Sequence, residues 1–450
     1  MGAEQAGTCA RGGMFGFRQI TGDFKSAFEK LVAYAASGGS LVISAAAQLI
    51  TFAVLARSLG VHEFSLFVAI TAICSVALHL CGLGAMESLV RRVARDPSAY
   101  PVMLGHNLIL TAITGVVLVA AGVVGLPFLF KLSDDPALNA LLIGAMLATN
   151  IVLVRLIVLA EQTFIGRSEF GTANKIVVGF ALARTIAAVL ACFAFGVSTT
   201  AEWAIWQFVC HVLVALLCFR VLLRLGSPEF RIVQAEIKNG IYFCVPFILR
   251  AARQNVDLMV LSFVSTPEIV SSYSVARRMM ESSYLSVEAL NRLIYPGSAK
   301  ASAEGLHQIM ERVMKVLLAA TVISVAAAVT VFIIAPLLPY LFGHDYVSLV
   351  SFVRQLIWVV ILLAIWSVAV EALGAAGNHA YRGTVMSLGS LFGCAITAWA
   401  TWYAPPEGTI ISFYVIEFAM IVASWLVLLH AVRKSRIGSA GTHVLKGARS

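Results

Sequence analysis

The segment "VLLAATVISVAAAVTVFIIAPL", from Val316 to Leu337, contains no charged residue. An α-helix rises 1.5 Å per residue, so a helix of this length crosses a hydrocarbon core about 30 Å thick. Similar apolar segments recur along the 450 residues of the chain, of which 60% are hydrophobic and 12% are charged. Soluble chains are about a quarter charged. The sequence therefore predicts an all-α, polytopic membrane protein.

Twelve such segments can be recognised, and we expect each to form one transmembrane helix. They cover roughly residues 35–56, 64–84, 104–130, 137–160, 176–196, 202–223, 240–264, 268–294, 314–337, 347–371, 383–403 and 409–431. Residues 1–34 lack the apolar core of a cleavable signal peptide, so the first span is expected to remain in the protein.

The distribution of Lys and Arg predicts the orientation. If the N-terminus is inside, 23 of the 32 Lys and Arg residues fall on inner segments, whereas the outer loops hold only Arg57 and Lys131. This asymmetry follows the positive-inside rule and predicts that both termini are cytoplasmic. The net charge of +9 is then explained by topology and by anionic lipid, so it gives no reason to expect nucleic acid as a partner.

The chain contains a weak internal repeat with a period of about 210 residues. "GRSEFGTA" (Gly166–Ala173), after span four, resembles "GNHAYRGT" (Gly377–Thr384), after span ten. Six spans per repeat place both halves in the same orientation, which implies a pseudo-twofold axis along the membrane normal and a cavity between the halves. The predicted domains are a cytoplasmic segment 1–34, a six-helix bundle 35–223, a linker 224–239, a second six-helix bundle 240–432 and a basic tail 433–450.

Six motifs follow one another along the chain: "LARSLGVHEFSLFVAI", "ESLVRRVARD", "VDLMVLSFVSTPEIVSSYSVARRM", "LIYPGSAKASAEG", "YLFGHDYV" and "VEALGAAGN". Their order and spacing resemble those of the polysaccharide-exporter (Wzx-type) flippases of the multidrug/oligosaccharidyl-lipid/polysaccharide (MOP) superfamily. The resemblance covers most of residues 35–430. It implies a V-shaped, MATE-like transporter of two bundles, which moves undecaprenyl-pyrophosphate-linked oligosaccharide from the cytoplasmic to the periplasmic leaflet of a bacterial inner membrane.

Spans seven and eight carry charges at their centres. In "FILRAARQNVDLMVLSFV" (Phe247–Val264), three ionisable residues share one face of the predicted helix: Arg250, Arg253 and Asp257. In span eight the residues that share a face are Arg277, Arg278, Glu281, Glu288 and Arg292. An arginine at a span centre costs about 2.5–3.5 kcal/mol against lipid, so these side chains are expected to face protein or a water-filled cavity.

Two interpretations of these charges remain open. In the first, Asp257 and Glu281 pair with the arginines and hold the two spans together. In the second, the surplus of arginine binds the pyrophosphate of a substrate, because guanidinium groups bind phosphate oxygens in a bidentate manner. The predicted substrate-binding residues are Arg250, Arg253, Arg277, Arg278, Arg155 and Arg184.

Acidic residues beside these arginines are candidates for coupling transport to an ion gradient. A carboxylate in such a cavity can exchange a proton or hold Na⁺, and the candidates are Asp257, Glu281 and Glu288. Glu371 and Glu417, close to the membrane surfaces, are expected either to extend to the interface or to pair locally. No catalytic residue, no cofactor and no metal site is predicted, because the cysteines have no metal-ligand spacing.

The predicted function is therefore lipid-linked oligosaccharide transport by alternating access, coupled to an ion gradient, with the lipid-linked oligosaccharide and the bilayer as the expected partners. A multidrug or organic-cation antiporter of the same superfamily is the nearest alternative, although its cavity should be acidic or aromatic. A membrane enzyme that acts on the same lipid carrier is disfavoured by the short outer loops and by the absence of phosphate-loop, HExxH and GxSxG motifs. A polysaccharide polymerase and the chain-length machinery are the expected protein partners.

Overall fold

The computed structural model describes residues 9–301 and 306–447, and this part of the chain is helical, without strands. Side chains are described for residues 39–288 and 310–434, apart from residue 41. Residues 1–8 and 448–450 of the predicted terminal segments, and the side chain of Arg292, lie outside the described part. The α-helices are α1 (Cys9–Leu80), α2 (Ala85–Arg95), α3 (Tyr100–Gly125), α4 (Pro136–Leu147), α5 (Val154–Gly166), α6 (Phe170–Val189), α7 (Thr200–Leu223), α8 (Gln234–Val264), α9 (Pro267–Ala301), α10 (Leu306–Ile334), α11 (Leu338–Phe342), α12 (Leu349–Leu356), α13 (Val359–Ala375), α14 (His379–Tyr403) and α15 (Glu407–Gly447).

The helices account for the twelve predicted spans. Nine helical segments in the described part are long and apolar enough to cross a membrane. The first of them, Val42–Leu80, contains two spans because the helix is broken at Gly60, where φ is 71°. Helices α8 and α9 are not among the nine, although they contain 31 and 35 residues. These are the two spans with central charges, and counting them completes the twelve.

Short non-α segments join several helices into continuous rods. Span four consists of α4, the π-helical segment Ala148–Leu153 and α5, while span five consists of α6 and a second π-helical segment, Leu190–Ala194. Short 3-10 turns at Pro97–Ala99, Leu126–Phe128 and Ala335–Leu337 lie at helix ends. The extra residue of a π-turn rotates the following helix, so these segments set the direction of side chains beyond them.

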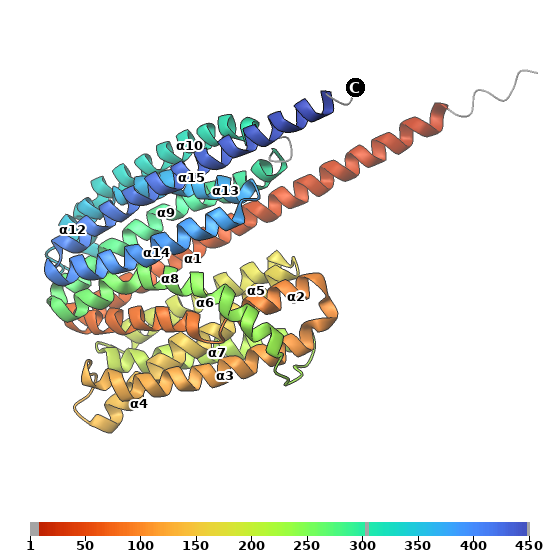
Figure 1. The fold of residues 1–450 in the computed structure, drawn as a ribbon. Coiled ribbons are helices and arrows are strands. Elements are labelled where there is room, and N and C mark those ends of the chain that lie inside the picture. The colour runs from red at the N-terminus through yellow and green to blue at the C-terminus, as the bar shows by residue number, and fades with distance from the viewer. Residues whose placement is uncertain (1–8, 302–305, 448–450) are drawn as a thin grey trace, which may run out of the picture.

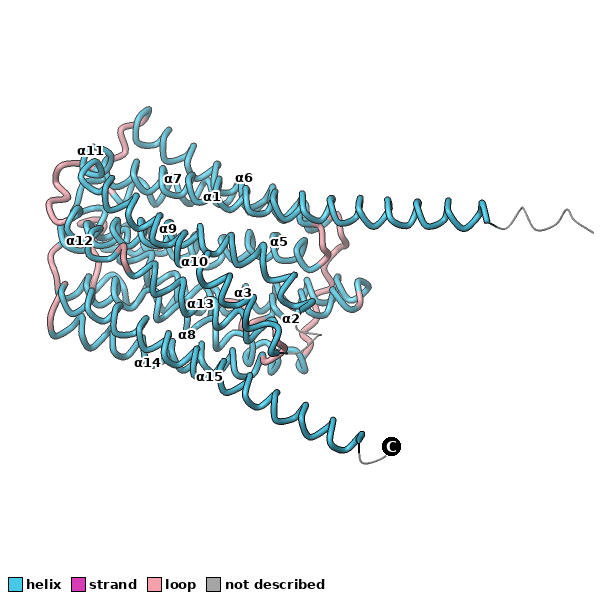
Figure 2. The backbone as a smooth tube through the Cα atoms, turned by 90° about the horizontal axis from the view of Figure 1, so that it is seen from above, coloured by secondary structure: helices cyan, strands magenta, loops and turns pink. Residues whose placement is uncertain are grey.

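Helices α1, α8 and α9 lie between two groups of helices (Figure 1). Helix α1 packs against α6 on one side and against α8 and α9 on the other, and α8 packs against α14. Both views place the start of α1 and the end of α15 at the same end of the bundle (Figures 1 and 2). We call this the terminal end. Nothing in this arrangement tests the residue limits of the predicted domains, which stay predictions.

The two halves touch near both ends of the bundle. At the end opposite the termini, the hydroxyl of Ser271 donates to the carbonyl of Val61 at 2.6 Å, and that of Tyr346 donates to Ala56 at 2.7 Å. At the terminal end, the chain between α1 and α2 approaches the backbone of α8. A Cβ added to Gly84 would lie 2.0 Å from the carbonyl oxygen of Gly240, and the φ of Gly84 is 75°. Glycine is therefore required at position 84 by both space and conformation.

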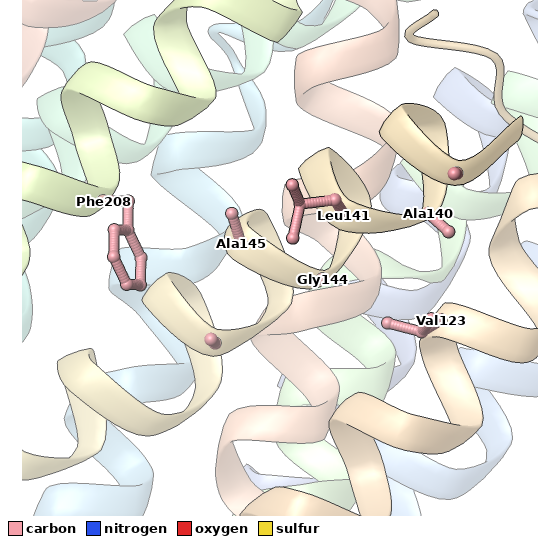
Figure 3. A pocket seen from close by; sticks show the side chains of 8 residues that line it. Val123, Ala140, Leu141, Gly144, Ala145 and Phe208 are labelled. Atoms are coloured by element: carbon pink, nitrogen blue, oxygen red, sulfur yellow. The ribbon is translucent and has the colours of Figure 1, made fainter. Parts of the chain in front are cut away.

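The outer surface is apolar, as lipid contact demands. An open groove between α3, α4 and α7 is lined by the apolar side chains of Val123, Leu141 and Phe208, with small residues of α4 at its base (Figure 3). None of the charged residues considered above lines this groove. The charges instead lie on α8 and α9 and on the helices around them, close to where α8 and α9 pack against α1, so this junction of the halves is the candidate site.

Candidate functional site

The centre of the second half contains a buried ion-pair network. Asp257 of α8 is 0% exposed and accepts a hydrogen bond from Arg277 of α9 and another, at 2.7 Å, from the hydroxyl of Tyr273. Arg277 is 4% exposed and also pairs with Glu281 at 3.2 Å. The ring of Phe413 covers its guanidinium at 5.9 Å. The expected pairing of Asp257 and Glu281 with a span-eight arginine is thus present in the structure.

Arg253 enters a second buried pair, with Glu417 of α15. Its Nη2 atom lies 2.5 Å from Oε1 of Glu417, and the indole N–H of Trp366 donates to Oε2 of the same carboxylate at 2.6 Å. Glu417 is 1% exposed. The expectation that Glu417 pairs locally near a membrane surface is therefore wrong, because its partner comes from α8 and the carboxylate lies inside the bundle. Glu371 does pair locally, with Arg382 at 2.8 Å.

Arg278 connects the two halves. Its guanidinium donates to the side-chain oxygen of Gln48 on α1 and lies 3.3 Å from Glu281, which it shares with Arg277. Arg184 of α6 lies close enough to Arg278 to feel its charge, and its guanidinium stacks on the ring of Phe180 at 5.7 Å. Within the described part of the chain, Arg184 has no carboxylate partner, and its Nε atom is buried without a hydrogen bond.

Arg250 is the exposed member of the group. No hydrogen bond or ion pair joins it to any other residue that the structure describes. It influences His79 of α1 and Tyr284 of α9 electrostatically, so it lies at the junction of the halves. His79 in turn stacks on Phe247, one turn before Arg250, with ring centroids 6.3 Å apart.

Arg155 and Glu288 lie at the edges of this junction. Arg155 of α5 is 3% exposed and lies 3.6 Å from Glu87 of α2, which leaves its Nε atom without a hydrogen bond. The charge of Arg155 also reaches His79, as the charge of Arg250 does, so Arg155 lies near the region around Arg250. Glu288 of α9 is half-buried and lies two turns beyond Glu281.

The junction therefore holds more positive than negative charge. Six candidate arginines stand against five acids. The acids are Glu87, Asp257, Glu281, Glu288 and Glu417. Two of the arginines, at positions 184 and 250, are the ones without a carboxylate partner among the described residues. In the same part of the chain, no group of three His, Cys, Asp or Glu side chains could hold a metal ion.

A separate ion-pair cluster holds the halves together at the terminal end. Glu236, at the start of α8, lies 3.2 Å from Arg91 and 3.3 Å from Arg92 of α2. Burial raises the pKa of Glu236, but a hydrogen bond from Asn239, the nearby hydroxyl of Ser88 and the two arginine charges outweigh it and leave the pKa below its usual value. The carboxylate is therefore ionised at neutral pH.

A family model described as "Polysaccharide biosynthesis protein" matches residues 34–302, more than half of the chain. The chain belongs to this family. No curated protein matches the sequence significantly.

This member of the polysaccharide biosynthesis family has the fold of known transporters. An inward-facing multidrug resistance MATE transporter of the MOP superfamily superposes with a TM-score of 0.70 at 16% identity, covering 86% of this chain and 94% of the transporter. The lipid II flippase MurJ, in an inward closed conformation, superposes with a TM-score of 0.69 at 14% identity, covering 90% and 87%. An outward-facing MATE transporter gives 0.62 at 17% identity, covering 90% and 96%.

These comparisons confirm the predicted resemblance and the fold class. The described residues contain nine helices able to cross a membrane, and the proteins that share the fold are transporters or flippases by title rather than enzymes. At such low identity the structural matches concern the fold alone, so the roles of individual site residues in this family member stay predictions.

Sequence reasoning missed several residues of the site. Gln48, Trp366 and Tyr273 each donate or accept a hydrogen bond to the charged residues, yet none belongs to a charge pattern in the sequence. The sequence marks them only as polar or amphipathic side chains within apolar spans. Glu417 carried a stronger signal, because a lone acid within a span requires a partner.

Proposed function

We propose that this protein flips undecaprenyl-pyrophosphate-linked oligosaccharide repeat units across the bacterial inner membrane, for exopolysaccharide or O-antigen assembly. Both termini lie in the cytoplasm, and the two halves alternate access to a site between them. The observation that supports this most directly is the pair Arg184 and Arg250, which lie at the junction of the halves without a carboxylate partner among the described residues.

Unpaired guanidinium groups at membrane depth favour an anionic ligand. Placing an arginine at the centre of a span costs about 2.5–3.5 kcal/mol of free energy, and more in simulations, unless water or a counter-charge is present. A pyrophosphate supplies the counter-charge and matches the planar donor fork of arginine. The sugars then occupy the space between the halves, while the polyprenyl chain remains in the lipid.

The same charges weigh against an antiporter for organic cations. A cationic drug between the halves would be repelled by the exposed Arg250, and the carboxylates nearby already pair with other arginines. Return of the empty protein is proposed to use a proton or Na⁺ gradient, with Asp257, Glu281 and Glu288 as the acids named by the sequence. A polymerase and the chain-length machinery would take up the product.

Reconstituted protein tests the proposal. Proteoliposomes that contain a labelled polyprenyl-pyrophosphate sugar should show flipping with the wild type. Arg250→Met and Arg184→Met should each lower the rate at least tenfold, whereas Arg250→Lys should restore part of it, because lysine retains the charge without the fork.

Arg354 provides a matched control. It also lies within a span and also contacts an aromatic ring, Phe332 at 4.9 Å, but it belongs to α12 and takes part in none of the contacts described for the junction. Arg354→Met should flip at the wild-type rate. Equal rates in the wild type, Arg250→Met and Arg184→Met would refute the anion site, and transport of organic cations instead of the lipid would support the antiporter.

A further inference from the structure

Glu417 is enclosed by three helices of the second half. On α15 itself its neighbours Ile416 and Met420 are apolar, and α14 adds Val385. Helix α13 contributes the N–H of Trp366, and α8 contributes Arg253. Among the residues that the structure describes, Arg253 is the charged group that acts on Glu417. The other charges on the helices packed against α15 pair with each other: Glu371 of α13 with Arg382 of α14, and Glu311 with Lys315 of α10. The ionised carboxylate therefore depends on this one cation.

Arg253 is held less firmly than Arg277. The guanidinium of Arg277 lies between two carboxylates, and its side chain is 5% exposed. Arg253 contacts one carboxylate, its side chain is 15% exposed, and none of its nitrogen atoms is both buried and unbonded. Its remaining N–H groups are therefore not fully covered by protein, so Arg253 can turn toward an external anion by breaking one ion pair.

The exposed side of Arg253 adjoins the region around Arg250. The two residues are one helical turn apart, about 4.5 Å along the axis of α8. On the facing helix, Tyr284 feels the charge of Arg250 and bonds to Ser367, the neighbour of Trp366. The proposed anion site and the surroundings of Glu417 are thus contiguous, and an anion bound at Arg250 would attract Arg253 as well.

We propose that Glu417 is a proton-binding site linked to anion binding through Arg253, an inference that rests on the proposed anion site. When Arg253 turns to the anion, Glu417 is left in apolar surroundings with Trp366 as its remaining donor. A lone buried carboxylate is unstable, so it takes up one proton from the solvent that reaches Arg253 and becomes a neutral acid. Arg253 keeps its charge throughout. Because linkage is reciprocal, protonation in turn favours anion binding.

The binding of a non-titrating anion measures this linkage directly. Methanedisulfonate has two tetrahedral anionic groups, like a pyrophosphate, but does not titrate near neutral pH. Calorimetry on the purified full chain at pH 6, 7 and 8, in buffers of different ionisation enthalpy, gives both the affinity and the number of protons taken up. The wild type should take up protons on binding, and its Kd should fall with decreasing pH, by at most tenfold per unit for one proton.

Three variants separate Glu417 from other titrating groups. Glu417→Gln should bind with no proton uptake and with a Kd that is independent of pH. His79 also lies near Arg250, so His79→Gln should retain the uptake. Glu371→Gln, which alters a carboxylate in another arginine pair, should also retain it. Uptake that persists in Glu417→Gln, or that disappears in His79→Gln, overturns the proposal.

A double variant covers the case in which Glu417→Gln does not fold. Arg253→Met with Glu417→Met replaces the ion pair by apolar groups of similar volume, a change that is often tolerated. It should bind methanedisulfonate through Arg250 with a pH-independent Kd, and pH-dependent binding here would contradict the linkage. A wild type that binds no methanedisulfonate would overturn both this inference and the anion site. Binding without proton uptake would overturn this inference alone.

Discussion

Asp257→Asn removes one charge from the buried network without changing its shape. The Asp257 carboxylate accepts hydrogen bonds from both Arg277 and Tyr273, and it is fully buried. Removing one partner of a buried ion pair costs about 3–5 kcal/mol. Arg277 retains Glu281 at 3.2 Å, so the lower end of that range applies. A loss of about 3 kcal/mol corresponds to roughly a hundredfold change in the unfolding equilibrium.

The folded fraction of a fluorescently tagged protein, measured by size exclusion after heating, detects such a change. Asp257→Asn should show a clearly lower thermal midpoint than the wild type. The double variant Asp257→Asn with Arg277→Gln should recover much of the loss, because the buried cation that had lost its Asp257 partner is then removed as well. Glu371→Gln is the control, since its partly exposed pair should contribute less than about 1 kcal/mol.

The opposite result would show a role in coupling. If Asp257 carries the coupling ion, Asp257→Asn should be stable and bind substrate, but its flipping should no longer respond to an imposed pH or Na⁺ gradient. Wild-type stability of Asp257→Asn, or a double variant no more stable than the single one, would refute the structural argument. Unchanged gradient dependence in Asp257→Asn, Glu281→Gln and Glu288→Gln would remove all three acids from the coupling role.

Two further predictions concern the terminal end of the bundle. Gly84→Ala should strongly reduce the yield of folded protein, because the added Cβ would lie 2.0 Å from the carbonyl oxygen of Gly240. Gly179→Ala is the control and should be tolerated, because no atom lies within 4 Å of its added Cβ. Equal yields of the two variants would contradict the close packing of α2 and α8. The lowered pKa of Glu236 stabilises the folded protein above the ordinary carboxyl value of 4.5, and this contribution is lost as the pH falls through the lower folded value. Thermal stability should therefore fall less steeply below pH 4.5 in Glu236→Gln than in the wild type, and identical acid profiles would refute the contribution of the cluster.

The fold could be predicted largely from the sequence because a bilayer imposes simple requirements. A helix must supply about 20 apolar residues to cross it, and this pattern is visible in Val316–Leu337 and its counterparts. Even α8 and α9 were recognisable as spans, since their central charges fall on one face of each helix. The same periodicity correctly indicated that Asp257 and a span-eight arginine could meet, because consecutive helices pack as neighbours.

The arrangement of the remaining charges depends on contacts between distant segments. Arg250 and Arg253 share one face of α8 in the sequence pattern, yet Arg253 pairs with Glu417, 164 residues away, and Arg250 is exposed. Periodicity gives the direction of a side chain around its own helix, but it does not give the helix that lies opposite. The composition of each span thus determines that it crosses the membrane. Only the packing of α8 against α14, α15 and α1 decides which guanidinium groups are neutralised and which remain available to an anion.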